Sequence, residues 1–385
     1  MLYNILFTYV LVGRGGDAVQ VNAFVEGFKN LGCQVVLTGP SPIKPYEFGS
    51  AEGKLRNVAR RLPWWAKDII EAALGLVTIR RAKNSIKKKK FDLIFHRAGI
   101  YDFAGCLLKK KNALPLIVHL DAPFPIEREY KGERYFKFFH KAAMKNIGKH
   151  ADLVVTMSEQ AKGYFVNLGI PEQRILVLPN GISHKRLQRG IALAAEHKPF
   201  FNEKKITLGF LGNLSRWHKV DLLLEAVKLL IEKQTHKYYL VVVGKGEEYE
   251  KLKEKTDVLG ISGYVEWVGH LPPGQAFEEI AKFDIAILPH TLTTGAPMKL
   301  FEYAALARPV VAPDLENINS LFCKDTEICL FDPGNVCDMV RAIELISSKK
   351  ELALTMGVKM QERVKSYTWE SIIKKILDAI AQKAI

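Results

Sequence analysis

Short apolar runs alternate with helical patterns along the whole chain. The runs are rich in Val, Ile and Leu and lack polar alternation, which is typical of strands buried on both faces of a parallel sheet. The first series comprises Leu2–Val10, Val35–Leu37, Leu93–Phe95, Leu116–Leu120, Leu153–Met157 and Ile175–Leu178. The second series comprises Ile206–Leu211, Tyr239–Val243, Val265–Val268, Ile285–Leu288 and Val310–Ala312. Helical patterns such as Ala18–Leu31 and Leu222–Gln234 lie between the strands, so the pattern predicts two α/β domains in tandem.

The stretch with the weakest strand pattern lies near the middle of the chain. We predict that residues 186–203 link an N-terminal domain, residues 1–185, to a C-terminal domain, residues 204–365. Residues 366–385 form a helical pattern that we expect to pack back on the N-terminal domain. A length of 385 residues accommodates two such domains, and a hydrophobic content of 48% excludes disordered and fibrous proteins.

The formal net charge of +15 comes entirely from the first half of the chain. Residues 1–200 hold 32 basic and 16 acidic side chains, whereas residues 201–385 hold 24 and 25. Within residues 54–90, twelve Lys and Arg interleave with aliphatic side chains and two tryptophans, and a basic amphipathic segment of this kind is typical of a membrane surface. A solvated basic face is the alternative. The predicted membrane-surface residues are Arg60, Arg61, Trp64, Trp65, Lys87, Lys88, Lys89 and Lys90.

A second basic segment, residues 134–149, has aromatic residues between its lysines. For this segment we expect a solvated helix face with the aromatic rings in the core. Basic segments with interleaved aromatics can also bind single-stranded nucleic acid. Because no recognition module is visible and the second half of the chain is neutral, we predict no nucleic-acid partner, and we keep a nucleic-acid-binding protein as a rival class.

Several segments bear on the cellular location. No apolar stretch is long enough to cross a bilayer, and the first residues lack a basic start and a cleavage site, so they predict a strand. The five cysteines fit neither a zinc pattern nor a redox pair, which favours a reducing cytoplasm. We therefore expect a cytoplasmic protein that is peripheral at the inner face of the cell membrane.

Three loops that follow strands carry candidate chemistry. Gly15 and Gly16 precede a helix, where backbone amides can approach an anion, although a plain tight turn is the alternative. Arg216 and Lys219 lie in one loop and could clamp a diphosphate, or could form a solvated basic loop. In the third loop a helix begins after a Gly-Ala-Pro turn, and Glu302 lies one turn in. Its carboxylate can accept hydrogen bonds from two ribose hydroxyls, or can simply complement the helix dipole.

Several short motifs occur along the chain in an order and spacing that are specific together. They are Gly15-Gly16, Arg97…Phe103-Ala104-Gly105, Asp121-Ala122-Pro123, Ala151-Asp152…Met157-Ser158, Leu178-Pro179-Asn180-Gly181, Val243-Gly244-Lys245-Gly246-Glu247, Val268-Gly269, Lys299-Leu300-Phe301-Glu302-Tyr303 and Arg308-Pro309-Val310-Val311. With these motifs the chain resembles, over nearly its whole length, a GT-B glycosyltransferase, most closely the retaining glycosyltransferase family 4. The resemblance implies an α/β fold with two Rossmann-like domains whose parallel sheets face a central cleft.

The resemblance also implies roles for the two domains. The N-terminal domain would receive the acceptor, with Arg97 and Asp102 on the acceptor side, and the C-terminal domain would hold a UDP-sugar or GDP-sugar as substrate, without a cofactor. Glu302 matches the glutamate that binds the nucleotide ribose. The implied donor-binding residues are Gly15, Gly16, Gly212, Asn213, His218, Gly244, Gly269, His270, Leu271, Thr294, Gly295, Ala296, Pro297, Met298, Lys299, Leu300 and Glu302.

The chain departs from the family pattern in the donor site. Thr294 stands where the family often has a second glutamate that touches the sugar. Asn213 stands where an arginine of the diphosphate clamp is usual, and His218 or Lys219 stands for the clamp lysine. Arg216 is the candidate that restores the missing charge from inside the same loop.

The family mechanism is retention by front-face attack, in which a donor phosphate oxygen helps to take the acceptor proton and no covalent nucleophile is needed. The predicted catalytic residues are His119, Asp121, Arg216 and Lys219. His119 or Asp121 would orient or deprotonate the acceptor, although a structural histidine at the strand end is an equal alternative. No Asp-x-Asp motif occurs, so we predict metal independence.

The predicted function is sugar transfer to a glycan or lipid-linked glycan in the synthesis of cell-surface polysaccharide or glycolipid. An enzymatic alternative is a nucleotide-sugar epimerase with the same architecture.

Overall fold

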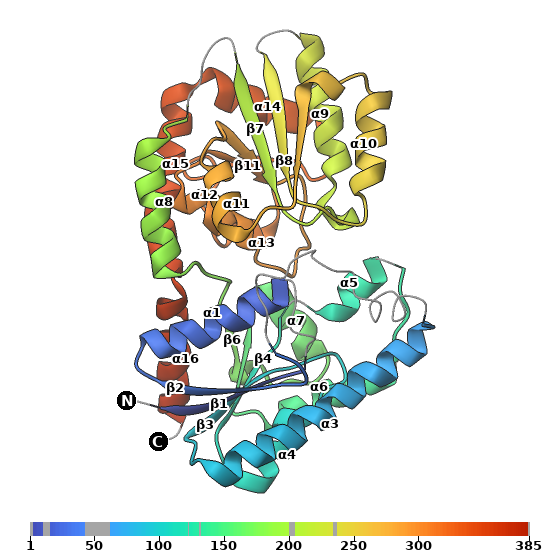
Figure 1. The fold of residues 1–385 in the computed structure, drawn as a ribbon, viewed down its shortest axis with the longest axis vertical. Helices are drawn as coiled ribbons and strands as arrows, with labels where there is room; N and C mark the ends of the chain where they lie inside the picture. Colours follow the sequence, from blue (N-terminus) through green and yellow to red (C-terminus); the bar gives the residue numbers. More distant parts are fainter. Residues whose placement is uncertain are drawn as a thin grey trace. The chain divides into compact units, whose positions relative to one another are not determined.

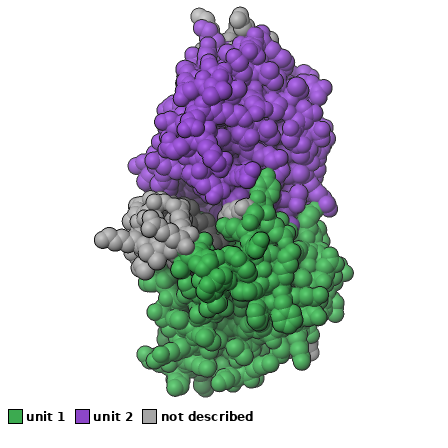
Figure 2. All heavy atoms as spheres, turned by 90° about the vertical axis from the view of Figure 1, so that its right-hand side faces the viewer, with its two compact units in different colours: residues 1–179, 369–385 green, residues 180–368 purple. Residues whose placement is uncertain are grey.

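The computed structural model describes residues 3–10, 16–42, 62–121, 123–130, 132–199, 205–233 and 237–383. The chain divides into two compact units, coloured separately in Figure 2. Unit 1 comprises residues 1–179 and 369–385, and unit 2 comprises residues 180–368. The predicted membrane-surface residues Arg60 and Arg61, and the predicted donor residue Gly15, lie outside the described residues.

Unit 1 is built on a six-stranded parallel sheet with the order β2-β1-β3-β4-β5-β6 (Figure 1). Its strands are β1 Asn4–Tyr9, β2 Gln34–Thr38, β3 Leu93–Arg97, β4 Leu116–His119, β5 Leu153–Thr156 and β6 Ile175–Val177. Its helices are α1 Gly16–Asn30, α3 Trp64–Lys88, α4 Ala104–Asn112, α5 Phe124–Tyr130, α6 Lys137–His150, α7 Glu159–Asn167 and α16 Trp369–Lys383.

Both faces of this sheet are buried, as the apolar strands predict. Successive residues of a strand point to opposite faces, so Ile5 and Phe7 join a core cluster with α1 and α16, while Leu6 joins a second cluster with α3, α4 and α6. Trp369 and Ile373 bring α16, the last helix of the chain, into the first of these clusters. The end of the chain is therefore part of the unit formed by its beginning.

Unit 2 repeats the architecture with the strand order β12-β11-β10-β7-β8-β9, again all parallel. Its strands are β7 Ile206–Leu211, β8 Tyr238–Val243, β9 Val265–Gly269, β10 Ile285–Ile287, β11 Val310–Pro313 and β12 Cys329–Phe331. Its helices are α8 His184–Glu196, α9 Val220–Lys233, α10 Tyr249–Val258, α11 Pro273–Ile280, α12 Met298–Ala305, α13 Glu316–Asn319, α14 Val336–Ser348 and α15 Lys350–Val364. The sequence pattern did not predict β12.

The predicted linker at residues 186–203 is wrong over most of its length, since helix α8 occupies His184–Glu196. Leu187, Gly190 and Leu193 of α8 are buried, and the helix packs on α12. A Cβ atom at Gly190 would lie 2.8 Å from the carbonyl oxygen of Ala305, so the two helices approach closely there. The units divide at Pro179, six residues before the predicted boundary, and α8 belongs wholly to unit 2.

Candidate functional site

The strand order of unit 2 marks where a ligand should bind. From β7 the chain builds the sheet in one direction through β8 and β9, and then returns to the other side of β7 to add β10. Open α/β sheets bind ligands at such a reversal, beyond the carboxyl ends of the strands. The loops after β7 and β10 therefore form the candidate site, with the loop after β8 beside them; β7 and β8 are labelled in Figure 1.

Glycines bring the loops after β7 and β8 into direct contact. Gly212 and Gly244 have φ angles of +152° and +136°, which side-chain-bearing residues rarely adopt. The amide of Gly212 donates to Val243 O at 2.9 Å, and that of Gly244 donates to Gly269 O at 2.7 Å. A Cβ atom at Gly244 would lie 1.9 Å from the carbonyl oxygen of Gly212. The close approach leaves no room for side chains, so backbone forms this edge of the site.

Lys299, in the first turn of α12, supplies a cation at the reversal point. Its Nζ lies 4.3 Å from the ring centroid of Phe210, the residue before the end of β7, and 2.6 Å from the position that a Cβ at Gly212 would occupy. This Nζ is buried, and it has no hydrogen-bond partner in the described part of the chain. Burial lowers the pKa of Lys299 to about 7, against the opposing charge of Glu302.

Two histidines, His218 and His290, lie in the loops after β7 and β10, and His218 is close enough to Lys299 to feel its charge. His290, after β10, donates from Nδ1 to the carbonyl oxygen of Trp217 at 2.8 Å, which ties the loop after β10 to the loop after β7. His218 keeps a buried Nδ1 without a partner among the described residues. Burial lowers the pKa of both rings, and the charge of Lys299 lowers that of His218 further. Unpaired buried donors are costly, so this group of side chains is suited to a ligand that brings negative charge.

Glu302 lies on the same face of α12, three residues after Lys299. Its carboxylate pairs with Arg186 of α8 at 2.7 Å. The Arg186 guanidinium lies 4.4 Å from the ring centroid of Phe277 and donates to Pro273 O at 3.2 Å, so α11 supports it from behind. Nothing in the sequence signals the Arg186–Glu302 pair, because 116 positions separate its members.

The loop that leads into α12 is held by two asparagine side chains. Asn317 donates to the carbonyl oxygens of Leu292 and Gly295 at 3.1 and 2.7 Å, and Asn180 donates to that of Ala296 at 2.8 Å. Helix α12 has Pro297 at its N-cap and no side-chain cap. The amides of its first turn are therefore fixed in place without a capping side chain, which favours an anion there.

The structure brings most of the predicted donor residues of unit 2 together at this edge. The two predicted clamp cations lie in the loop after β7, where Arg216 is exposed and Lys219 is partly buried with a left-handed backbone, φ +46°. A third cation, Lys299, is buried, and the sequence assigned it to the donor site without a charge role. The residues at the ends of β7 to β10 and at the start of α12 are Gly212, Asn213, His218, Gly244, Gly269, His270, Leu271, Thr294, Gly295, Ala296, Pro297, Met298, Lys299, Leu300 and Glu302.

Unit 1 has its own reversal point, between β1 and β3. Gly16 begins α1 after β1, and Arg97 ends β3 there. The guanidinium of Arg97 is buried, donates from Nε to Gln20 Oε1 of α1 at 2.9 Å, and pairs through Nη2 with Asp121 after β4. Arg97 therefore fixes the Asp121 carboxylate, which remains partly exposed at this edge of the sheet.

Two other predicted residues of unit 1 are fully buried. The His119 ring packs against Phe24 and Phe95, and burial together with the charge of Arg97 holds its pKa well below the usual range. A neutral, enclosed ring favours the structural alternative over a catalytic base. Asp102 accepts hydrogen bonds from His96 Nε2 at 2.7 Å, from the first amide of α4 at 2.7 Å and from the amide of Gly99 at 3.3 Å, so its buried carboxylate holds the loop after β3.

In the described ranges, no three His, Cys, Asp or Glu side chains gather into a group that could hold a metal ion. Nor does any helix there have the length and apolar character that a bilayer crossing requires.

Two α/β units on six-stranded parallel sheets, with an anion-suited edge in the second, define the GT-B class of glycosyltransferases. Family models agree: that of the glycosyltransferase family 4 domain matches residues 14–186, and that of glycosyl transferases group 1 matches residues 194–380. The chain therefore belongs to the GT-B glycosyltransferases of the family 4 type, as the sequence motifs predicted.

Two relatives share low sequence identity with this chain. An uncharacterized glycosyltransferase of Methanocaldococcus jannaschii is 23% identical over 76% of this chain and 75% of its own length. A D-inositol 3-phosphate glycosyltransferase of Geodermatophilus obscurus is 22% identical over 76% of this chain and 67% of its own. Among solved structures, Anabaena HepE in complex with UDP has a TM-score of 0.71 at 17% identity, covering 98% of this chain and 100% of that one. These likenesses show the fold.

Proposed function

We propose that this glycosyltransferase moves a sugar, with retention, from a UDP-sugar or GDP-sugar to a glycan or lipid-linked glycan in the synthesis of cell-surface polysaccharide or glycolipid. The observation that carries the donor assignment is the pair formed by Lys299 and Glu302 on one face of α12, at the reversal of the sheet. A cation followed by a carboxylate one turn along matches a diphosphate followed by a ribose.

The side chains of the site suggest how it would act on such a donor. Lys299 and the first amides of α12 would stabilise the charge that develops on the leaving diphosphate, and preorganised stabilisation of this kind commonly contributes more to catalysis than any other effect. Glu302 would accept hydrogen bonds from the ribose hydroxyls, with Arg186 holding the carboxylate in place. The acceptor proton would pass to a donor phosphate oxygen, so neither His119 nor a covalent nucleophile is required.

The names of structural neighbours narrow the choice of donor for this proposal. HepE of Anabaena is described in complex with UDP, with UDP and glucose, and with UDP-glucose. This favours a UDP-sugar over a GDP-sugar as the first substrate to test. Two of the relatives are named as D-inositol 3-phosphate glycosyltransferases. A small phosphorylated polyol is therefore the main alternative to a glycan as the acceptor.

A screen of nucleotide-sugars by thermal unfolding tests the donor. We expect one UDP-sugar to raise the Tm, because a ligand that binds only the folded state at about 100 times its Kd adds roughly 2.7 kcal/mol of stability. UMP and a single-stranded oligonucleotide are the matched controls. A Tm that rises with the oligonucleotide and with none of UDP-glucose, UDP-galactose, UDP-N-acetylglucosamine and GDP-mannose would contradict the proposal. Release of an epimerised sugar from the donor alone would identify the epimerase alternative.

The lipid-linked acceptor would bring the protein to a membrane, and we place it at the cytoplasmic face of the cell membrane. The excess of basic residues in the first half of the chain supports this placement.

A further inference from the structure

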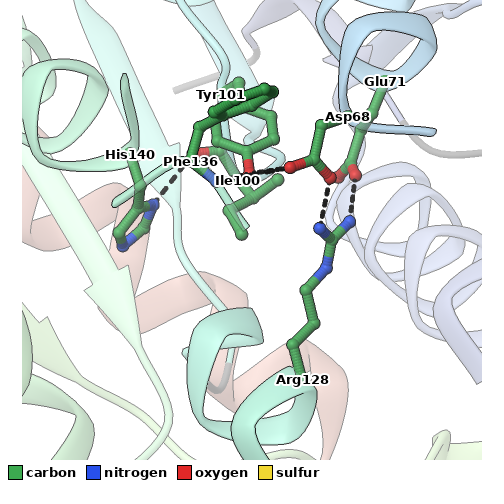
Figure 3. Close-up of polar contacts among 7 residues, drawn as sticks. All are labelled: Asp68, Glu71, Ile100, Tyr101, Arg128, Phe136 and His140. Carbon is green, nitrogen blue, oxygen red and sulfur yellow. Dashed lines mark hydrogen bonds and ion pairs between the residues drawn. The ribbon is translucent and has the colours of Figure 1, made fainter. Parts of the chain in front are cut away.

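Both acidic residues of α3 point into unit 1, where one arginine holds them. Arg128 of α5 pairs through Nη1 with Asp68 and through Nη2 with Glu71 at 2.6 Å (Figure 3). Tyr101 donates its hydroxyl to Asp68 at 2.6 Å and accepts the backbone amide of Phe136 at 2.9 Å. Asp68 is buried by these contacts, so the only two carboxylates of α3 are turned away from its outer face.

The outer face of α3 is consequently apolar and basic. At about 100° per residue, Trp65, Ile69, Leu76 and Arg80 fall within roughly 60° of one another on the helix. Ile69 and Leu76 have exposed fractions of 56% and 67%. The exposed residues in the first half of the helix are largely apolar and those in the second half largely basic, and none is acidic. They are Trp65, Lys67, Ile69, Ile70, Ala72, Ala73, Leu76 and Val77, followed by Arg80, Arg81, Asn84, Lys87 and Lys88.

The first turn of α6 extends this face. The Phe136 ring lies 4.8 Å from that of Trp64 and 5.8 Å from that of Phe139, which joins the start of α6 to the start of α3. Phe138 is 78% exposed, and Phe139 is exposed beside it. The expectation that the aromatics of residues 134–149 lie in the core is therefore wrong for these two. Lys137 and Lys141 are exposed on the same turn, where Lys137 pairs with Glu129 of α5 at 3.5 Å.

The basic half of α3 also meets lysines of α4. Lys83 of α3 lies close to Lys111 of α4, an adjacent helix. Because the two charges are alike, the Lys111 ammonium lowers the pKa of Lys83. No carboxylate offsets this repulsion at Lys83, whose pKa among the described residues responds only to neighbouring lysines and to burial. Close cations without counter-charges on a surface are repulsive unless an anionic partner neutralises them.

We infer that the outer face of α3 and the first turn of α6 form a docking surface for an anionic lipid bilayer. The apolar side chains would enter the region between head groups and acyl chains, and the basic half of α3 would contact lipid phosphates. A second copy of the chain is a poorer occupant, because a symmetric dimer would place two strongly basic faces against each other. The inference rests on the proposed lipid-linked acceptor, and it adds which surface of unit 1 meets the membrane.

Flotation with phosphatidylcholine vesicles, with and without 30% phosphatidylglycerol, tests the surface on the full chain. We expect the protein to float with the anionic vesicles only, and raised salt to weaken the binding. The double variant Ile69→Asp with Leu76→Asp should bind at least tenfold less. The matched control is Val258→Asp with Val358→Asp, which places the same charges on exposed valines of α10 and α15 in unit 2 and should bind like the wild type.

Absence of wild-type flotation, or equal flotation of the two double variants, would overturn the inference. A dimer on size exclusion that only the α3 variant dissolves would assign the surface to a second copy instead. Thermal stabilisation by the nucleotide-sugar is measured on the same samples. Donor binding without flotation refutes the docking surface alone, whereas flotation without donor binding refutes the proposed function alone.

The role of Arg128 is tested by removing its guanidinium, which breaks the ion pairs with Asp68 and Glu71. Arg128→Met should weaken flotation, because Asp68 and Glu71 lose the cation that holds them turned inward, and the triple variant Arg128→Met, Asp68→Asn, Glu71→Gln should restore it. Thermal unfolding identifies the variants that are folded. Equal flotation of the triple variant and wild type supports the role even if the single variant does not fold, while loss in the folded triple variant contradicts it.

Discussion

Replacing Lys299 with methionine should weaken nucleotide-sugar binding by about 10- to 150-fold, equivalent to one charged hydrogen bond of roughly 1.5–3 kcal/mol. Methionine retains most of the apolar stem against Phe210 and removes the ammonium. Isothermal titration with the nucleotide-sugar identified in the screen measures the effect. Lys251→Met, on an exposed lysine of α10, is the matched control and should bind like the wild type.

The same variant should change the pH profiles in a direction that only a buried cation explains. The pKa of Lys299 is about 7 in the folded protein and ordinarily 10.5, so the unfolded chain binds more protons between these values. Stability of the wild type should therefore rise with pH over this window, and Lys299→Met should flatten the rise and be more stable near pH 7. Donor affinity of the wild type should fall as pH rises through 7, because the Lys299 side chain loses its proton in this range. Binding of a diphosphate then requires that Lys299 take up a proton again.

The conservative variant Lys299→Arg separates the charge of this side chain from its titration. A guanidinium stays protonated throughout this pH range, so the variant should bind the donor with little dependence on pH between about 6 and 9. A wild-type affinity that does not change with pH, together with unaltered binding by Lys299→Met, would contradict the role of Lys299 as the diphosphate cation.

Glu302→Ala should lower donor affinity on the order of 100-fold, since it removes an ionised acceptor of two hydroxyl hydrogen bonds. Arg186→Met should cost about tenfold, because Glu302 then loses the partner that orients it. We expect the double variant to bind no worse than Glu302→Ala alone, as Arg186 acts through Glu302. Titration calorimetry on the wild type, the two single variants and the double variant gives the coupling energy between Arg186 and Glu302.

Two comparisons make this cycle specific. Arg186→Lys should recover part of the affinity, because a lysine keeps the charge and loses the planar stacking on Phe277. Arg189→Met changes an exposed arginine one turn further along α8 and should leave donor binding intact. Tighter binding by Arg186→Met would show instead that Arg186 competes with the ribose for the carboxylate of Glu302.

Much of the fold could be predicted from the sequence, because buried parallel strands are apolar throughout and leave a local signal. Among the described residues, eleven of the twelve strands overlap the expected runs, and the exception is β12. Helix α8 was also missed. Its buried positions, Leu187, Gly190 and Leu193, are few, and only the neighbouring α12 shows why they are covered.

The candidate site could be predicted only in part. Motif order located the loops after β7, β8 and β10 and the ribose glutamate Glu302. It could not show that Arg216 is exposed while Lys299 is buried beneath Gly212, because both are basic residues near a loop. It also could not find Arg186 or His290, whose partners lie far away in the sequence.

The sequence by itself determined the α/β class, the two series of strands and the membership of the GT-B glycosyltransferases, since these depend on local hydrophobic patterns and on the order of motifs. The tertiary structure alone decided which polar groups are paired and which faces are covered. Arg128 turns Asp68 and Glu71 inward, Phe138 is left exposed, and Lys299 is buried without a hydrogen-bond partner among the described residues. Burial and pairing depend on contacts between segments that are distant along the chain, and hydropathy patterns contain no record of those contacts.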